Sequence, residues 1–133
     1  PPATGDAKSY SLADAVAAGN MNRSMELFRE LINDPENTPV YLLYVLTGSM
    51  NDLYRARLAL DYNHGLPEIM KDFGYSPSVE FRVKNALSSV RRTDIRHLRK
   101  CLEILAKADI DMKSSGADPA VILEKAIVEM LAR

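Results

Sequence analysis

A chain of 133 residues, 47% hydrophobic and 26% charged, has the length of one domain and enough apolar side chains for a core. A single cysteine and six glycines exclude a disulfide scaffold and a collagen-like repeat. The 17 Lys and Arg residues and 18 Asp and Glu residues give a net charge of −1. That balance argues against a dedicated nucleic-acid binder, because such proteins usually carry a strong basic excess.

The start of the chain and its longest apolar runs bear on the cellular compartment of the protein. No apolar run approaches the roughly 20 residues that cross a bilayer, and the start does not resemble a signal peptide. We therefore expect a cytoplasmic protein with no membrane partner, in which a lone thiol stays reduced. Residues 1–9 have the composition of a linker and do not begin with Met. A fragment of a longer protein is favoured over removal of an initiator methionine, which leaves residues 10–133 as one helical domain.

From residue 10 onward, start and stop signals bracket stretches with the 3.6-residue periodicity of helices. Capping side chains, some followed by proline, are expected at Asn20, Thr38, Ser76, Thr93 and Asp118. No segment alternates with a period of two, so the sequence predicts an all-α fold, a compact bundle of about seven helices. Gly48 lies inside the third helix and is expected to mark a close helix crossing. The expected helices span residues 11–18, 20–33, 38–62, 67–73, 77–90, 93–113 and 119–133.

Each enzyme signature is missing or incomplete, so no catalytic residue, metal ligand or cofactor site is expected. Residues 5–9 have the wrong spacing for a phosphate-binding loop and no strand before them. His97 and Cys101 stand one helical turn apart, but the other imidazole, His64, lies in a distant loop, whereas metal sites need three or four clustered ligands. A buried thiol is the favoured interpretation of Cys101.

Asp109 is the most unusual acid in the sequence. It takes the place of an apolar residue in the periodic series of the 93–113 helix, and a buried acid must be hydrogen-bonded or paired. One interpretation is a general base with a raised pKa. The favoured one is a structural acid that accepts hydrogen bonds from a helix N-terminus or an arginine, because no second carboxylate or histidine has compatible spacing.

Positive charge is concentrated between residues 82 and 100, where the only acid is Asp94. This basic face could contact phosphates or an acidic partner. Residues 66–86 also have helix–turn–helix proportions, with polar side chains on the second helix, although this motif recurs in proteins that do not bind DNA. Sequence-specific DNA reading is therefore less favoured than a solvated basic face or one matched to an acidic partner. The basic residues are Arg82, Lys84, Arg91, Arg92, Arg96, Arg99 and Lys100.

A surplus of apolar residues is the second binding signal. Val121 and Val128 fall on the opposite side of the last helix from its broad apolar face. The 38–62 helix begins apolar on every face and carries Tyr41 and Tyr44. The surplus is either ordinary core or a contact between subunits, and the spacing alone leaves both open.

Four segments, in order, carry a family resemblance: residues 12–20, the Leu-Tyr-Arg-Ala-Arg stretch at 53–57, residues 67–75, and the run 105–119 that ends in Asp-Pro. Together they resemble the C-terminal domain of the delta subunit of bacterial DNA polymerase III, part of the sliding-clamp loader. The resemblance covers about nine tenths of the chain. One departure is Ser115, where the family pattern has Gly, and it affects only the turn.

The resemblance implies a helical collar that packs beside the gamma/tau and delta-prime subunits and holds a five-subunit ring together. It implies no ATP hydrolysis by this domain, and contact with the sliding clamp only through N-terminal domains outside this chain. We therefore expect a non-catalytic oligomerisation domain without a cofactor. Tyr41, Tyr44, Val121 and Val128 are the expected contacts with other subunits, and the basic face is expected to meet DNA or an acidic neighbour. The alternative is a stand-alone helix–turn–helix DNA-binding protein.

Overall fold

The computed structural model describes residues 4–132, with side chains from residue 7 onward. Within that range the chain forms seven α-helices, two 3₁₀ turns and no strand, which confirms the predicted all-α fold. No helix in the same range is long and apolar enough to cross a membrane. The elements are α1 (Thr4–Ala17), α2 (Met21–Ile32), α3 (Pro39–Asp61), α4 (Leu66–Asp72), η1 (Pro77–Val79), α5 (Glu80–Ser89), η2 (Val90–Arg92), α6 (Ile95–Ser114) and α7 (Pro119–Leu131).

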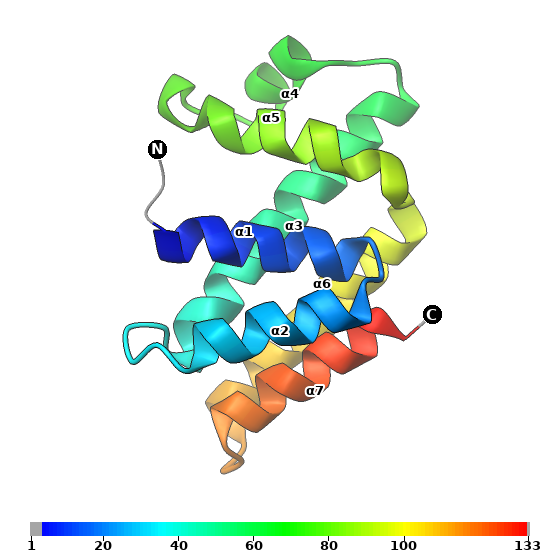
Figure 1. Cartoon of the computed structure of the whole chain (residues 1–133). Helices are drawn as coiled ribbons and strands as arrows, with labels where there is room; N and C mark the ends of the chain where they lie inside the picture. The colour runs from blue at the N-terminus through cyan, green and yellow to red at the C-terminus, as the bar shows by residue number, and fades with distance from the viewer. Residues whose placement is uncertain (1–3, 133) are drawn as a thin grey trace.

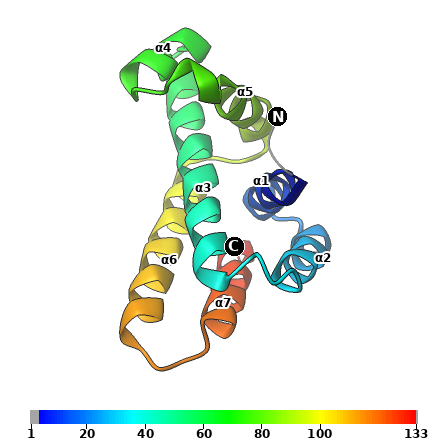
Figure 2. The same ribbon diagram turned by 90° about the vertical axis from the view of Figure 1, so that its left-hand side faces the viewer.

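Helix α3 is the centre of the molecule and packs against α1, α4, α5, α6 and α7. Figure 1 shows α1 and α2 lying side by side across it, and Figure 2 shows α4 and α5 at its C-terminal end. Its inward stripe is Leu42, Leu46, Met50 and Leu53, each at most 2% exposed, with the three- and four-residue spacing of a buried helix face. The opposite side is open, since Tyr44 is 77% exposed. The apolar start of this helix is therefore buried on one side only.

Three of the predicted caps are confirmed. The side chains of Asn20, Thr38 and Asp118 each accept a hydrogen bond from a backbone N–H in the first turn of α2, α3 and α7, at 2.9–3.1 Å. Each bond satisfies one of the amide groups that a helix start leaves without a partner. These helices therefore begin where the local sequence predicts.

The predicted start of α6 is wrong by one residue. Asp94, and not Thr93, accepts a hydrogen bond from the N–H of His97, at 2.9 Å. Thr93 instead donates its own N–H to the carbonyl of Val90, 3.3 Å away, and so completes the η2 turn before the helix begins. The single helix predicted for residues 77–90 is likewise divided, with a 3₁₀ turn at each end of α5.

The linker predicted for residues 1–9 is wrong for residues 4–9, which form the first part of α1. Ser9 is completely buried, and the Tyr10 ring lies 6.4 Å from the ring of Phe81 on α5. The glycine and small polar residues there favour a loop by composition, but tertiary contacts override such weak local preferences. Residues 1–3 lie outside the described range, and the domain boundary stays a prediction.

The close helix crossing expected at Gly48 is also wrong, because a Cβ added there would meet nothing within 4 Å. We predict that Gly48→Ala raises the free energy of unfolding by about 0.5–1 kcal/mol, since glycine in a helix interior carries a conformational-entropy cost. Urea denaturation followed by circular dichroism measures the change. Gly74→Ala is the control: its surroundings are equally open, but its φ of +68° makes alanine strained, so stability should fall. A destabilised Gly48→Ala variant would contradict the prediction.

Candidate functional site

The residues considered for catalysis or metal binding do not come together. No three His, Cys, Asp or Glu side chains between residues 7 and 132 are placed to hold a metal ion. Cys101 is completely buried, as predicted, and its Sγ lies 3.7 Å from Nε2 of His97. His64 is exposed in the loop after α3, away from that pair in the sequence.

The buried seam position predicted for Asp109 is wrong. Helix α6 turns Leu105 and Ala108 inward, which leaves Asp109 half-buried at the edge of the packed face. Its carboxylate pairs with Lys113 one turn further on, at 2.9 Å. The partner of this acid is therefore a lysine of the same helix, not an arginine or a helix N-terminus.

Among residues 7–132, the buried acid is Asp52 on α3, which was not predicted from the sequence. It is only 6% exposed, and its two carboxylate oxygens accept hydrogen bonds from Nε and Nη2 of Arg82, both at 3.0 Å. The hydroxyl of Tyr75 donates to the same carboxylate. A signal was present in the spacing, because Asp52 lies three residues after Ser49 and four before Ala56, both of which face inward.

The structure divides the predicted basic face. Arg82 belongs to the buried ion pair with Asp52, and Lys84 pairs with Glu80 on its own helix, at 3.3 Å. The second helix of a DNA-reading helix–turn–helix contacts DNA through exposed polar side chains. On α5, two such side chains, Arg82 and Lys84, are already in ion pairs. The remaining five cations have no carboxylate partner among residues 7–132. We call this group the basic strip: Arg91, Arg92, Arg96, Arg99 and Lys100.

Of these five, two make neutral contacts: Arg99 reaches the Tyr54 hydroxyl at 3.5 Å, and Lys100 reaches the carbonyl of Ala132 at 3.1 Å. All five side chains are exposed. The strip runs from η2 into the first turns of α6, where the helix dipole already favours negative charge. Cations at this end of a helix are electrostatically unfavourable without an anion, so the strip is suited to a negatively charged partner.

The expected contact residues are exposed, but they lie on two surfaces. Tyr41 and Tyr44 line a groove of about 410 Å³, which we call the tyrosine groove. Val121, 57% exposed, lines a second groove of about 300 Å³ between α6 and α7, and Val128, 44% exposed, is also on α7. The tyrosine groove is lined by Tyr10, Tyr41, Tyr44, Val45, Thr47, Gly48, Ser49, Asn51 and Arg82.

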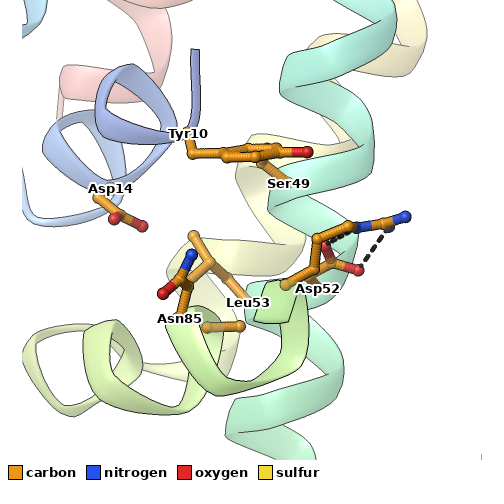
Figure 3. A pocket seen from close by; sticks show the side chains of 8 residues that line it. Tyr10, Asp14, Ser49, Asp52, Leu53 and Asn85 are labelled. Atoms are coloured by element: carbon orange, nitrogen blue, oxygen red, sulfur yellow. Dashed lines mark hydrogen bonds and ion pairs between the residues drawn. The ribbon is translucent and has the colours of Figure 1, made fainter. Parts of the chain in front are cut away.

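A small cavity lies where α1 and α5 both meet α3 (Figure 3). Asp14 reaches toward it from α1 and Asn85 from α5, while Tyr10 extends across to α3 beside Ser49. Burial raises the pKa of the Asp14 carboxyl, and a hydrogen bond from Ser89 lowers it in part. The cavity shares Tyr10, Ser49 and Arg82 with the tyrosine groove, so the two are adjacent.

We predict that Asp14→Asn is more stable than the unaltered chain at pH 7. Because the pKa of Asp14 is higher in the folded state, the folded protein binds more protons, and its stability falls as pH rises above the ordinary value of 3.8. The asparagine variant lacks this loss, so the difference should vanish below about pH 4. Urea denaturation at pH 3.5 and pH 7 measures it. Asp111→Asn, at an exposed ion pair with Lys107, should show no such gain.

Comparison with known proteins agrees with this architecture. Residues 6–130 match the family model of the DNA polymerase III delta subunit, C-terminal domain. The DNA polymerase III subunit delta of Bacillus subtilis (strain 168) is 23% identical over 124 residues, covering 93% of this chain and 35% of that relative. The chain therefore spans about a third of the length of the curated relative it matches.

A solved structure, the Bacillus subtilis DNA clamp loader delta protein, has the same fold. Its TM-score is 0.85 at 20% sequence identity, and the match covers 98% of this chain and 37% of that one. The helices, their order and their packing thus correspond along almost the whole chain. Because the family model covers all but a few terminal residues, the chain belongs to the family of C-terminal domains of DNA polymerase III delta subunits.

Proposed function

We propose that this chain is a non-catalytic oligomerisation domain of a clamp-loader delta subunit, which helps to assemble the ring that loads the sliding clamp in DNA replication. Its partners in that ring are the gamma/tau and delta-prime subunits, and the sliding clamp is reached only through other domains of the same subunit. Family membership supports the proposal, and the exposed tyrosine pair on the central helix carries it. A bacterial replication subunit of this kind works in the cytoplasm, without a membrane partner.

The tyrosine groove is suited to contact another protein. Tyrosine is enriched in protein interfaces because it offers a large, fairly rigid apolar surface together with a polar tip. Tyr44 is 77% and Tyr41 41% exposed, and Gly48 keeps the groove open beside them. A partner side chain of ordinary size fits a hollow of about 410 Å³.

A subunit inside a ring contacts two neighbours through two different surfaces, because ring contacts are head-to-tail. The exposed residues on this domain are distributed in the same way. Tyr41 and Tyr44 lie at the tyrosine groove, whereas Val121 lines the groove between α6 and α7. We assign one neighbour to each groove, with Val128 in the second contact.

The basic strip supports a second proposal, namely that it contacts DNA phosphates when the complex is assembled. Four of its five side chains are arginines, whose planar guanidinium groups bind phosphate through two hydrogen bonds. None has a carboxylate partner within the described part of the chain. A stand-alone helix–turn–helix protein is not favoured, because Arg82 on α5 is held by Asp52 of α3.

The first proposal is tested by mixing this domain with the C-terminal domains of gamma/tau and delta-prime, and following the mass by light scattering during gel filtration. We predict a stable complex, and about tenfold or weaker affinity when Tyr41 and Tyr44 are changed to Ser, because aromatic anchors dominate interface energies. Tyr62→Ser is the matched control, since Tyr62 lies at the other end of α3 and is 70% exposed. No complex with the unaltered chain, or equal loss with the control, would refute the proposal.

For the basic strip, we predict that Arg91→Glu with Arg92→Glu weakens binding of the assembled complex to primed DNA and reduces the salt dependence of that binding. Binding to each phosphate releases counterions from the DNA. With fewer phosphate contacts, fewer counterions are released, so the slope of log affinity against log salt becomes shallower. Lys107→Glu is the control, because Lys107 is exposed on α6 outside the strip. Normal DNA binding with impaired association of the subunits would assign the strip to an acidic neighbour, and normal behaviour in both assays would leave it without either role.

A further inference from the structure

The chemistry of the tyrosine groove indicates what kind of side chain can fill it. Of the described residues that line the groove, Arg82 alone is charged, and the others are three tyrosines and uncharged residues of α3. The carboxylate that pairs with Arg82 belongs to Asp52, whose side chain is 6% exposed, whereas that of Arg82 is 30% exposed. The positive end of this ion pair therefore lies toward the groove.

The guanidinium group of Arg82 is held in place before any partner binds. Its Nε and Nη2 each donate to a carboxylate oxygen of Asp52 at 3.0 Å, and the ring centre of Tyr75 lies 5.7 Å from its Cζ. A guanidinium has five N–H donors, and the pair with Asp52 uses two of them, both on one edge. The Nη1 end makes no hydrogen bond within the described part of the chain, and it is the side from which a partner can approach.

A protein that covers the groove has to compensate this end of Arg82. In the free domain the side chain is partly exposed, so water can bond to the remaining N–H groups. Covering the groove removes that water, and a charged donor left without an acceptor in an interface costs more free energy than a neutral one. A carboxylate replaces the water best, because charge-assisted hydrogen bonds are about twice as strong as neutral ones and two carboxylate oxygens match the guanidinium fork.

We propose that the neighbouring subunit inserts an Asp or Glu side chain into the tyrosine groove, where its carboxylate binds the Nη1 end of Arg82. The apolar surface beside that carboxylate packs on Tyr41 and Tyr44. Tyrosine and arginine are enriched among the residues that dominate interface energies, and a guanidinium that is already fixed loses little conformational entropy on binding. The inference rests on the proposed function, since a neighbouring subunit has to cover this groove.

Asn51 offers a test that leaves the pair of Asp52 with Arg82 intact. It lines the groove and is partly exposed, and Asn51→Asp changes its charge but hardly its shape. We expect Asn51→Asp to weaken assembly with the gamma/tau and delta-prime subunits about tenfold or more, because the new carboxylate repels the incoming one and competes with it for Arg82. Asn51→Lys, of the opposite charge, should bind at least tenfold more tightly than Asn51→Asp.

Asn22→Asp is the matched control, since Asn22 is exposed on α2 and lines neither groove. It makes the same exchange of side chain and the same change in net charge, so an effect of overall charge would appear in both variants. Isothermal titration calorimetry gives the affinities, and circular dichroism checks that each variant keeps the helical fold. We expect the control to bind like the unaltered chain.

A structure of the assembled complex supplies the direct observation. The expected result is a carboxylate oxygen of the neighbouring subunit within hydrogen-bond distance of Nη1 of Arg82. A complex in which a neutral group meets Arg82, or in which Asn51→Asp binds as tightly as the unaltered chain, would overturn this inference and leave the proposed function intact. If the unaltered chain forms no complex, both are refuted.

Discussion

The carboxylate of Asp52 lies buried in the middle of the central helix, and the packing of one half of the molecule depends on how it is neutralised. Arg82 supplies two hydrogen bonds from α5, and Tyr75 supplies one from the turn after α4. Removing either partner would leave a charge buried with too few bonds, which costs several kcal/mol in comparable sites. The chain between Tyr75 and Arg82 must therefore return to α3 at this point. That requirement fixes where α5 crosses α3 and where α4 lies.

The same interaction decides how charge is distributed on the surface. Tyr75 lies between Arg55 and Arg82, whose guanidinium carbons are 5.5 and 5.7 Å from its ring centre. Burial and the hydrogen bond to Asp52 raise the pKa of the Tyr75 hydroxyl, so it remains a neutral donor. Both arginines are thus half-buried and held by contacts within the α3–α4–α5 unit. Within residues 82–100, the exposed cations without a carboxylate partner in the described part of the chain lie on η2 and the start of α6.

Features that depend on a few neighbouring residues were predictable from the sequence, and features that depend on packing were not. The helix starts at Thr38 and Asp118 follow from a side chain that bonds to the next turn, and they are correct. The choice between Asp52 and Asp109 as the buried acid depends on the rotation of each helix against its neighbours. Asp109 stands in an apolar series and Asp52 stands beside one, and only the packed structure shows that α6 turns Ala108 inward while α3 turns Asp52 inward. The linker prediction was wrong for residues 4–9 for a similar reason, since Lys8 pairs with Glu30 of α2 and Ser9 is buried.

At 20% identity the fold of a solved clamp-loader delta protein is retained with a TM-score of 0.85. Many different apolar side chains can fill one core if volume and pattern are kept, so most positions of this domain are only loosely constrained by its fold. Nothing in the packing of α3 requires a large aromatic side chain at Tyr44, which is 77% exposed. Arg99 and Lys100 bond to other parts of the fold, but Arg91, Arg92 and Arg96 are exposed, and the packing does not require cations at these three positions. Exposed residues that the fold does not explain are the ones for which a binding partner is the simplest physical reason. Under the proposed function, the binding properties of the chain belong to its surface, at the tyrosine groove and the basic strip, and its interior determines how those surfaces are arranged.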